Sequence, residues 1–287
     1  GATTTITDVV GNAKRYYRIA IDGTAPVAYS ENEVGTIPCT IPGSTQTGKT
    51  GPHLAMIALS VQPFGSTMIQ DTVYWQLTGS DSDVGSDLVW DWDELLVTPD
   101  YLTNWVYDGG VPFIEDTGFD GTWVDKDGNP SADAFGLTEG AWVRYDRTYD
   151  QVINTEGEVV TTGTSIAIQP GGGMDSNSRT IQMLSTGYAA PVALTEAATS
   201  LWADGAWGSD SDINSDLIWR WNKMNQDYDT FWLYDGATQG PPDDTGFDGT
   251  WVDKDGNPAS FTFDEGEAVW YRRLGDVTPF NWTCPVP

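Results

Sequence analysis

The sequence predicts an all-β protein made of two tandem β-sandwich-like or jelly-roll-like modules. Three observations support this fold class. Short runs of Val, Trp, Tyr and Thr stand between turn residues. The 287 residues include 32 Gly and 16 Pro, which disfavour long helices. A long stretch of the chain also occurs twice, and the 14 Trp residues supply enough apolar surface for two ordinary cores.

The internal repeat defines the expected domain organisation. The thirteen residues from Gly118 to Pro130 recur unchanged from Gly246 to Pro258, at an offset of 128 positions. Further matches upstream and downstream keep nearly the same offset. We therefore predict five segments: an N-terminal strand segment at 1–29, a first module at 30–147, a linker at 148–156, a second module at 157–275 and a C-terminal tail at 276–287.

The elements inside each module are expected to be short strands. In Val89-Trp90-Asp91-Trp92, alternation places both tryptophans on one face of the strand and Asp91 on the other. The second copy keeps Trp219 and Trp221 but has Arg220 between them, which predicts core-facing tryptophans and a free outer position. One short helix is expected between Val192 and Ser200, where the sequence is apolar and rich in Ala.

Charge excludes two classes of partner. The chain has 42 Asp and Glu against 13 Lys and Arg, a formal net charge of -29. Nucleic-acid binding needs clustered Lys and Arg, so we expect no nucleic-acid partner. No apolar run approaches the roughly 20 residues of a membrane-spanning helix, so direct membrane insertion is not expected either.

The sequence offers little material for catalysis. The single histidine, His53, and two cysteines cannot form a His-rich zinc site, and no Gly-x-Ser-x-Gly motif accompanies His53. Residues 43–50 match a P-loop pattern but lack the expected strand before it and helix after it. Paired carboxylates could serve a glycoside hydrolase, which is the third and least favoured alternative. We predict that the protein is not an enzyme.

The cysteine usage predicts an exported protein. Cys39 and Cys284 are the only cysteines of an acidic, Lys-poor chain. This pattern is typical of extracellular or cell-surface proteins with one disulfide. The opening residues from Gly1 would suit a mature form after signal removal. We predict that Cys39 and Cys284 form a disulfide within or between chains; a pair of free buried thiols is the alternative.

Two acidic turns are candidate calcium sites. Asp125–Asn129 and Asp253–Asn257 alternate carboxylates around a glycine, as in half of a calcium-binding loop. The bidentate Glu of an EF-hand is absent from both, which excludes that motif. The alternative is that Asp-Gly-Asn simply forms a good hairpin turn. Calcium is the only cofactor expected, with these candidate ligands: Asp116, Asp125, Asp127, Asn129, Asp244, Asp253, Asp255 and Asn257.

Tryptophan carries the binding prediction. Twelve of the 14 tryptophans fall into repeat pairs, and pairing across both copies is what core packing produces. Trp207 and Trp282 have no repeat partner. Exposed Trp and Tyr rings form sugar-binding platforms, so we predict that Trp207 and Trp282 are exposed contacts for extracellular glycans.

The N-terminal segment carries the assembly prediction. Lys14–Ile19 resembles the last strands of the modules near residues 141–145 and 269–273, so this strand occurs three times although whole modules occur twice. We predict that Tyr16, Tyr17 and Ile19 complete the sheet of a neighbouring copy by strand addition. The alternative is docking on the chain's own body.

A family resemblance points to the same compartment. The Trp-x-Trp strand, the Trp-Val/Leu-Tyr-Asp-Gly strand, the Gly-Thr-Trp-Val-Asp turn and the closing Glu-Gly-x-x-Trp strand together resemble tandem modules of large secreted surface proteins of environmental bacteria. The segments at 14–18 and 279–282 share this resemblance. It implies an exported β-rich protein and transfers no catalytic residues.

These observations favour a non-enzymatic structural subunit of an extracellular filament or surface assembly, with copies of itself as partners. The alternative is a glycan-binding adhesin or an accessory carbohydrate-binding protein.

Overall fold

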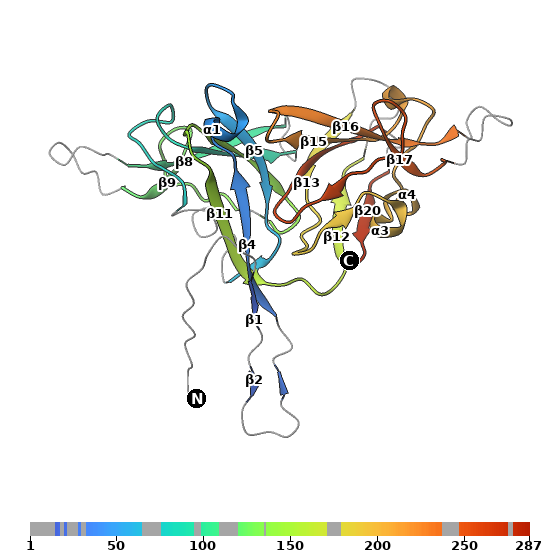
Figure 1. Ribbon diagram of the computed structural model, residues 1–287, viewed down its shortest axis with the longest axis horizontal. Helices are drawn as coiled ribbons and strands as arrows, with labels where there is room; N and C mark the ends of the chain where they lie inside the picture. The colour runs from blue at the N-terminus through green and yellow to red at the C-terminus, as the bar shows by residue number, and fades with distance from the viewer. Residues whose placement is uncertain are drawn as a thin grey trace.

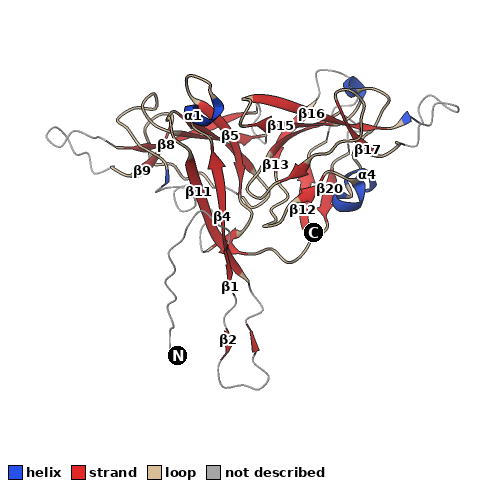
Figure 2. Cartoon of the chain, in the orientation of Figure 1, coloured by secondary structure: helices blue, strands red, loops and turns tan. Residues whose placement is uncertain are grey.

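The computed structural model confirms the all-β fold class. It describes residues 33–64, 76–94, 99–108, 120–134, 136–170, 179–236, 247–274 and 278–287, together with the backbone of three short N-terminal strands. Over this part of the chain, antiparallel sheets form two modules side by side, and all helices are short (Figures 1 and 2). None of the described helices has the length and hydrophobicity needed to span a membrane.

The first module pairs a five-stranded sheet with a smaller one. The large sheet has the order β5-β10-β7-β8-β9, and the smaller has the order β1-β4-β11-β6. Their bounds are β1 Arg15–Tyr17, β4 Val34–Ile41, β5 His53–Ala58, β6 Gln62–Pro63, β7 Leu88–Asp93, β8 Asp100–Tyr107, β9 Thr122–Asp125, β10 Gly140–Tyr145 and β11 Gln151–Glu158. Strands β2 (Ala20–Ile21) and β3 (Ala28–Tyr29) pair with each other.

The second module has a five-stranded sheet with the order β13-β19-β15-β16-β17. As in the first module, the first and last strands of the sheet in sequence are neighbours, and the second, third and fourth follow in turn. Two-stranded ribbons β12-β20 and β14-β18 accompany it. The bounds are β12 Thr164–Ile168, β13 Thr180–Leu184, β14 Val192–Ala193, β15 Leu217–Asn222, β16 Asp227–Tyr234, β17 Thr250–Asp253, β18 Thr262–Phe263, β19 Val269–Arg273 and β20 Phe280–Cys284.

The short helices lie at turns. The helix expected between Val192 and Ser200 is present only in part, because Val192 and Ala193 form β14 and the helix α3 covers only Glu196–Thr199. Ser200 adopts a left-handed conformation with φ 54° that ends α3, and a second short helix, α4 (Leu201–Asp204), follows beyond the expected range. The structure also describes the helix α1 (Ser44–Thr47) and the 3-10 helix η2 (Asp212–Asn214).

Each module is a sandwich with its own core. In the first, side chains of β4 and β11 pack onto one face of the large sheet, as Ile41 and Ile153 do against Val143. In the second module, β12 and β20 pack onto the large sheet in the same way, with Ile168 and Trp282 in the core. Burial of these alternating apolar faces is the main stabilising term of both sandwiches.

The boundary between the modules differs from the expected linker. Residues 151–158 form β11, which pairs along its whole length with β4 of the first module. The connection to the second module therefore begins after Glu158. Likewise, the predicted C-terminal tail contains β20, which pairs with β12 across five residues. Buried residues alternate along both segments, at Ile153, Thr155 and Gly157 in β11 and at Trp282 and Cys284 in β20, so the two strands complete the sandwiches that the five-stranded sheets begin.

The second faces of the two large sheets meet at a junction between the modules. Trp90 and Trp92 of β7 lie there, with their counterparts Trp219 and Trp221 of β15. The predicted alternation is therefore present, but the expectation of a free outer position for Asp91 is wrong. Asp91 lies on the face of Val89, which packs in the sandwich core, because the tryptophans face the other module.

Candidate functional site

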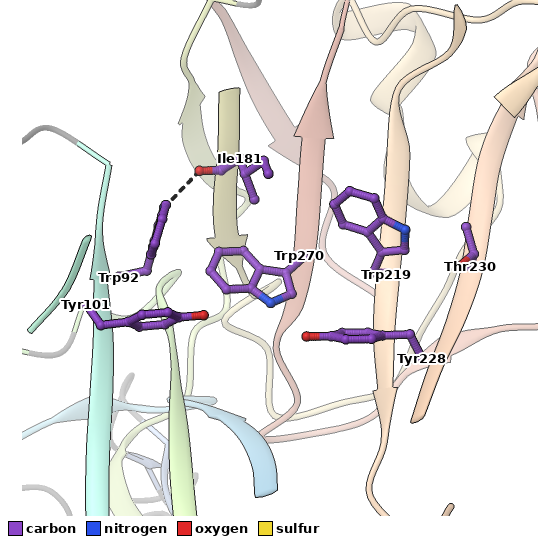
Figure 3. Close-up of a pocket in the computed structure, with 7 residues that line it drawn as sticks. All are labelled: Trp92, Tyr101, Ile181, Trp219, Tyr228, Thr230 and Trp270. Carbon is purple, nitrogen blue, oxygen red and sulfur yellow. Dashed lines mark hydrogen bonds between the residues drawn. The ribbon is translucent and has the colours of Figure 1, made fainter. Parts of the chain in front are cut away.

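An aromatic groove lies at the junction between the modules, within the part of the chain that the structure describes. Its volume is about 390 Å³, within the usual range of small-ligand pockets. Strands of both modules contribute to it: β7 and β8 from the first, and β13, β15, β16 and β19 from the second. The lining side chains, drawn in Figure 3, are Trp92, Tyr101, Ile181, Trp219, Tyr228, Thr230 and Trp270.

The rings of the groove hold one another in place. Trp92 packs edge-on against Trp270, with ring centroids 5.3 Å apart, and against Tyr101 at 5.0 Å. Its indole N–H donates to the carbonyl oxygen of Ile181 at 2.9 Å, so the ring is fixed at both ends (Figure 3). Because Trp92, Tyr101 and Trp270 all contact one another, this side of the groove is formed before any ligand arrives.

The same contacts recur across the junction with the modules exchanged. Trp221 packs edge-on against Trp142 at 5.1 Å and against Tyr228 at 4.9 Å. Its indole N–H donates to the carbonyl oxygen of Leu54 at 2.7 Å. Gln226 adds two hydrogen bonds to the backbone of Leu54. The two modules are therefore joined by a reciprocal aromatic contact, in which each inserts a Trp-Tyr pair against the other.

Two tyrosines form the solvent-facing part of the groove. Tyr101 is 37% exposed and Tyr228 is 42% exposed. Figure 3 shows the two side chains reaching toward each other from opposite modules, with Trp270 between them. Burial raises the pKa of both phenols, against the opposite effect of the indole N–H groups of Trp142 and Trp270. Both hydroxyls therefore stay protonated at neutral pH and can donate hydrogen bonds to a ligand.

The two tryptophans predicted as binding residues have different positions. Trp207 is 41% exposed but does not line the groove. The prediction for Trp282 is wrong: its side chain is 1% exposed, and its indole N–H donates to the carbonyl oxygen of Thr199 at 2.6 Å. Trp282 lacks a repeat partner because it belongs to β20, which lies beyond the repeated segment that sequence comparison detects.

The acidic turns have their oxygens engaged within the turn. One carboxylate oxygen of Asp125 accepts the backbone N–H groups of Asp127 and Asn129, both at 2.9 Å. The carboxylate of Asp127 pairs with Lys126 at 2.8 Å. The second turn has the same contacts, with Asp253 accepting from Asp255 and Asn257. The geometry is that of an Asx-stabilised hairpin turn.

The predicted calcium ligands are therefore only partly placed. Asp116 and Asp244 lie outside the described residues. Within the described part of the chain, no three His, Cys, Asp or Glu side chains are arranged to hold a metal ion. Calcium binding stays a prediction.

A group of partly buried carboxyls in the first module was not predicted from the sequence. Burial, together with the nearby charges of Asp133 and Glu139, raises the pKa of Asp91 to about 8. The pKa of Asp133 is also raised by burial, although the Asn104 side chain donates to it at 2.6 Å. The exchange of Asp91 for Arg220 between the repeats was the signal in the sequence that could have indicated this group.

The predicted disulfide is not formed. Cys39 and Cys284 are both free and buried, one in the core of each module. Burial raises the pKa of the Cys39 thiol and raises that of Cys284 to about 12. Since the thiolate is the reactive form, both side chains act as small apolar core residues.

The N-terminal strand lies at the edge of the smaller sheet. Strand β1 pairs antiparallel with β4 of its own chain, with Tyr16 opposite Gly35 and Tyr17 opposite Val34. Ile19 lies outside the described residues. The three strands β1, β2 and β3 project from the two-module body (Figure 1).

The fold and the groove thus define the class: a two-module all-β protein with an aromatic groove between its modules. Comparisons of the chain with protein-family models, with curated proteins and with solved structures find no match.

Proposed function

We propose that the protein is a non-enzymatic structural subunit of an extracellular filament or surface assembly. In the assembly, β1 of one copy pairs with β4 of the next copy. One observation carries the proposal: a projecting N-terminal strand occupies a sheet edge through a ladder of only three residues, Arg15–Tyr17 against Val34–Thr36.

Exchange of this strand between copies keeps every hydrogen bond of the ladder. Backbone pairing does not depend on which chain supplies the strand, so β1 of a neighbour fits the edge of β4 in the same register. Such an exchange joins copies head to tail and therefore generates a filament or an open array unless the geometry closes into a ring. At its other edge, β4 is paired along all eight of its residues with β11, so β4 is a rigid template for an incoming strand.

The body of the protein suits a building block. Both modules have their own cores, and the reciprocal aromatic junction holds them together as one unit. The net charge of -29 opposes unspecific association between copies, so a directional contact such as strand exchange is needed to bring them together.

Engineered cysteines distinguish pairing within a chain from pairing between chains. One preparation carries Tyr17→Cys and another, with a different tag, carries Val34→Cys; both have the native cysteines replaced by Ser. We expect mixed assemblies to form disulfide-linked dimers of the two tagged chains, because the two positions are directly opposite in the ladder.

A matched control uses a ladder that stays within one chain. Ser165 and Thr283 are directly opposite in the β12-β20 ribbon and both are exposed. Split between two preparations in the same way, Ser165→Cys and Thr283→Cys are expected to give no mixed dimer. A second test removes residues 1–21, and we expect folded protein that remains monomeric by negative-stain microscopy. Polymers that are unchanged by this deletion would refute the proposal.

A further inference from the structure

The aromatic groove has the properties of a ligand site that assembly does not require. We propose that it binds a neutral carbohydrate chain, with a sugar ring packed on Tyr101 and Tyr228. This inference goes beyond the proposed function, because strand exchange involves the smaller sheet, none of whose strands lines the groove.

The exposure of the rings supports stacking of a flat, weakly polar ligand. Trp270 is buried and forms the inner wall, while Tyr101 and Tyr228 keep more than a third of their surface open. A pyranose ring presents a face of C–H groups, which carry partial positive charge. The faces of aromatic rings carry partial negative charge, so the two surfaces attract each other and exclude water.

Polar groups at the rim of the groove match the hydroxyls of a sugar. Three hydroxyl groups line the groove, those of Tyr101, Tyr228 and Thr230. Each of them can donate a hydrogen bond and can also accept one. The indole N–H of Trp92 is already used by Ile181, so it serves the scaffold rather than the ligand. A small number of fixed polar groups on an apolar wall is the usual composition of a site that orients a ligand.

The charge of the groove selects a neutral ligand. None of the seven lining residues carries a formal charge, although the chain carries -29 in total. An acidic sugar would be repelled by the surrounding protein field without meeting a cation in the groove. A cationic ligand would meet no carboxylate there. Six of the seven lining residues are aromatic or hydroxyl-bearing, with Ile181 the single aliphatic one, which favours a saccharide over a lipid tail.

The arrangement of the rings makes the site preorganised. Trp92 makes edge-on contacts with both Tyr101 and Trp270, and Tyr101 and Tyr228 remain 37% and 42% exposed. Because the rings come from both modules, a bound chain contacts both of them at once. The ligand therefore loses its own freedom on binding but orders little of the protein.

The test is isothermal titration of the full-length protein with a panel of neutral oligosaccharides. The panel contains hexamers of β-1,4-linked glucose, β-1,3-linked glucose, α-1,4-linked glucose and β-1,4-linked mannose. We expect at least one of them to bind, and Tyr101→Ala and Tyr228→Ala each to weaken it about tenfold. Tyr228→Phe keeps the ring and removes the hydroxyl, so a loss of roughly threefold is expected.

Two exposed aromatic residues outside the groove provide matched controls. Tyr149 is 60% exposed and Phe247 is 40% exposed. Tyr149→Ala and Phe247→Ala are expected to leave the affinity unchanged, and circular dichroism verifies that all variants are folded. The proposal is overturned if no member of the panel binds, or if the control variants weaken binding as much as the groove variants. It is also overturned if a proline-rich peptide binds the groove while the sugars do not, since such peptides also dock in aromatic grooves.

Discussion

The two modules have large sheets of the same strand order, but they treat their buried carboxyls differently. In the described part of the second module, the buried Asp216 and the largely buried Glu267 each pair with an arginine. Asp216 is fully buried and accepts from Arg273 at 2.7 Å and from the hydroxyl of Tyr271 at 2.7 Å. Glu267 accepts from Arg220 at 2.7 Å. These contacts neutralise the charge that burial would otherwise destabilise.

The first module has the same acidic positions without the arginines. Asp87 accepts from a backbone N–H at 2.9 Å, as Asp216 does at 2.8 Å, but Tyr145 stands where the second module has Arg273. Asp91 replaces Arg220 beside Glu139. Burial raises the pKa of both Asp87 and Asp91.

The modules also differ in the side chains that lie near these carboxyls. Asn104 is buried and bonds to the side chains of Ser131 and Asp133, whereas the second module stacks Phe231 on Phe261 with centroids 5.2 Å apart. The same arrangement of strands therefore holds an ion pair and stacked aromatic rings in the second module, and a set of hydrogen-bonded carboxyls in the first. The hydrogen-bonded carboxyls make stability depend on protonation. Burial also raises the pKa of Glu267 in the second module, but we expect the larger pH response in the first module, where the pKa of Asp91 rises to about 8.

The largest effect is expected from removing the arginine partner of the buried Asp216. Arg273→Met leaves a carboxylate without its cation in the core, which costs about 3 to 5 kcal/mol of unfolding free energy in urea at pH 7. The matched change in the first module, Tyr145→Phe, removes one hydrogen bond and is expected to cost about 1 kcal/mol. Equal losses at the two positions would show that the modules do not differ as described.

The junction tests whether the modules contribute equally to their contact. Trp92→Ala and Trp221→Ala each remove a hydrogen-bonded ring, so each is expected to cost about 3 kcal/mol. The Trp→Phe versions keep most of the packing and are expected to cost about 1 kcal/mol. Unequal losses for the two alanine variants, measured by urea unfolding, would contradict the reciprocal geometry.

The pH response is expected to depend on Asp91. Its pKa rises from the ordinary 3.8 to about 8 in the folded protein, so the folded state binds the proton more tightly than the unfolded state. This stability is fully present below about pH 4 and is lost as pH rises toward 8.

Asp91→Asn removes this titration. We expect the variant to be more stable than the native protein at pH 8 by on the order of 2 kcal/mol, with a flatter profile between pH 4 and 8. Asp91→Arg, which introduces the residue of the second module beside Glu139, is expected to do the same. An unchanged pH profile of the urea midpoint in both variants would locate the response elsewhere.

The smallest effect is expected at the acidic turns, where the modules are alike. Asp125→Ala and Asp253→Ala each remove two backbone hydrogen bonds of an exposed turn, so both should lower the melting temperature slightly and equally. The same variants test the calcium prediction. If the turns bind calcium, adding it stabilises the native protein and leaves the double variant unchanged; equal responses would refute calcium binding at these turns.

Local features of the structure were predictable because they depend on neighbours in sequence. Alternation along 89–92 predicts which side chains share a face, and it holds in both copies. The Asp-Gly-Asn segments form the hairpin turns that their composition favours, with Gly128 and Gly256 at φ 79° and 80°. Burial of one residue does not follow from such patterns, as Trp282 and the two cysteines demonstrate.

By itself, the sequence determined the all-β class and the content of the turns, since strand alternation and turn formation involve residues a few positions apart. Only the tertiary structure decided what each face packs against. Trp92 meets Trp270 across 178 positions, and Ile181 and Leu54 accept the two indole N–H groups from the opposite modules. The groove exists because two sheets meet there, and the spacing of residues along either strand contains no information about the partner sheet.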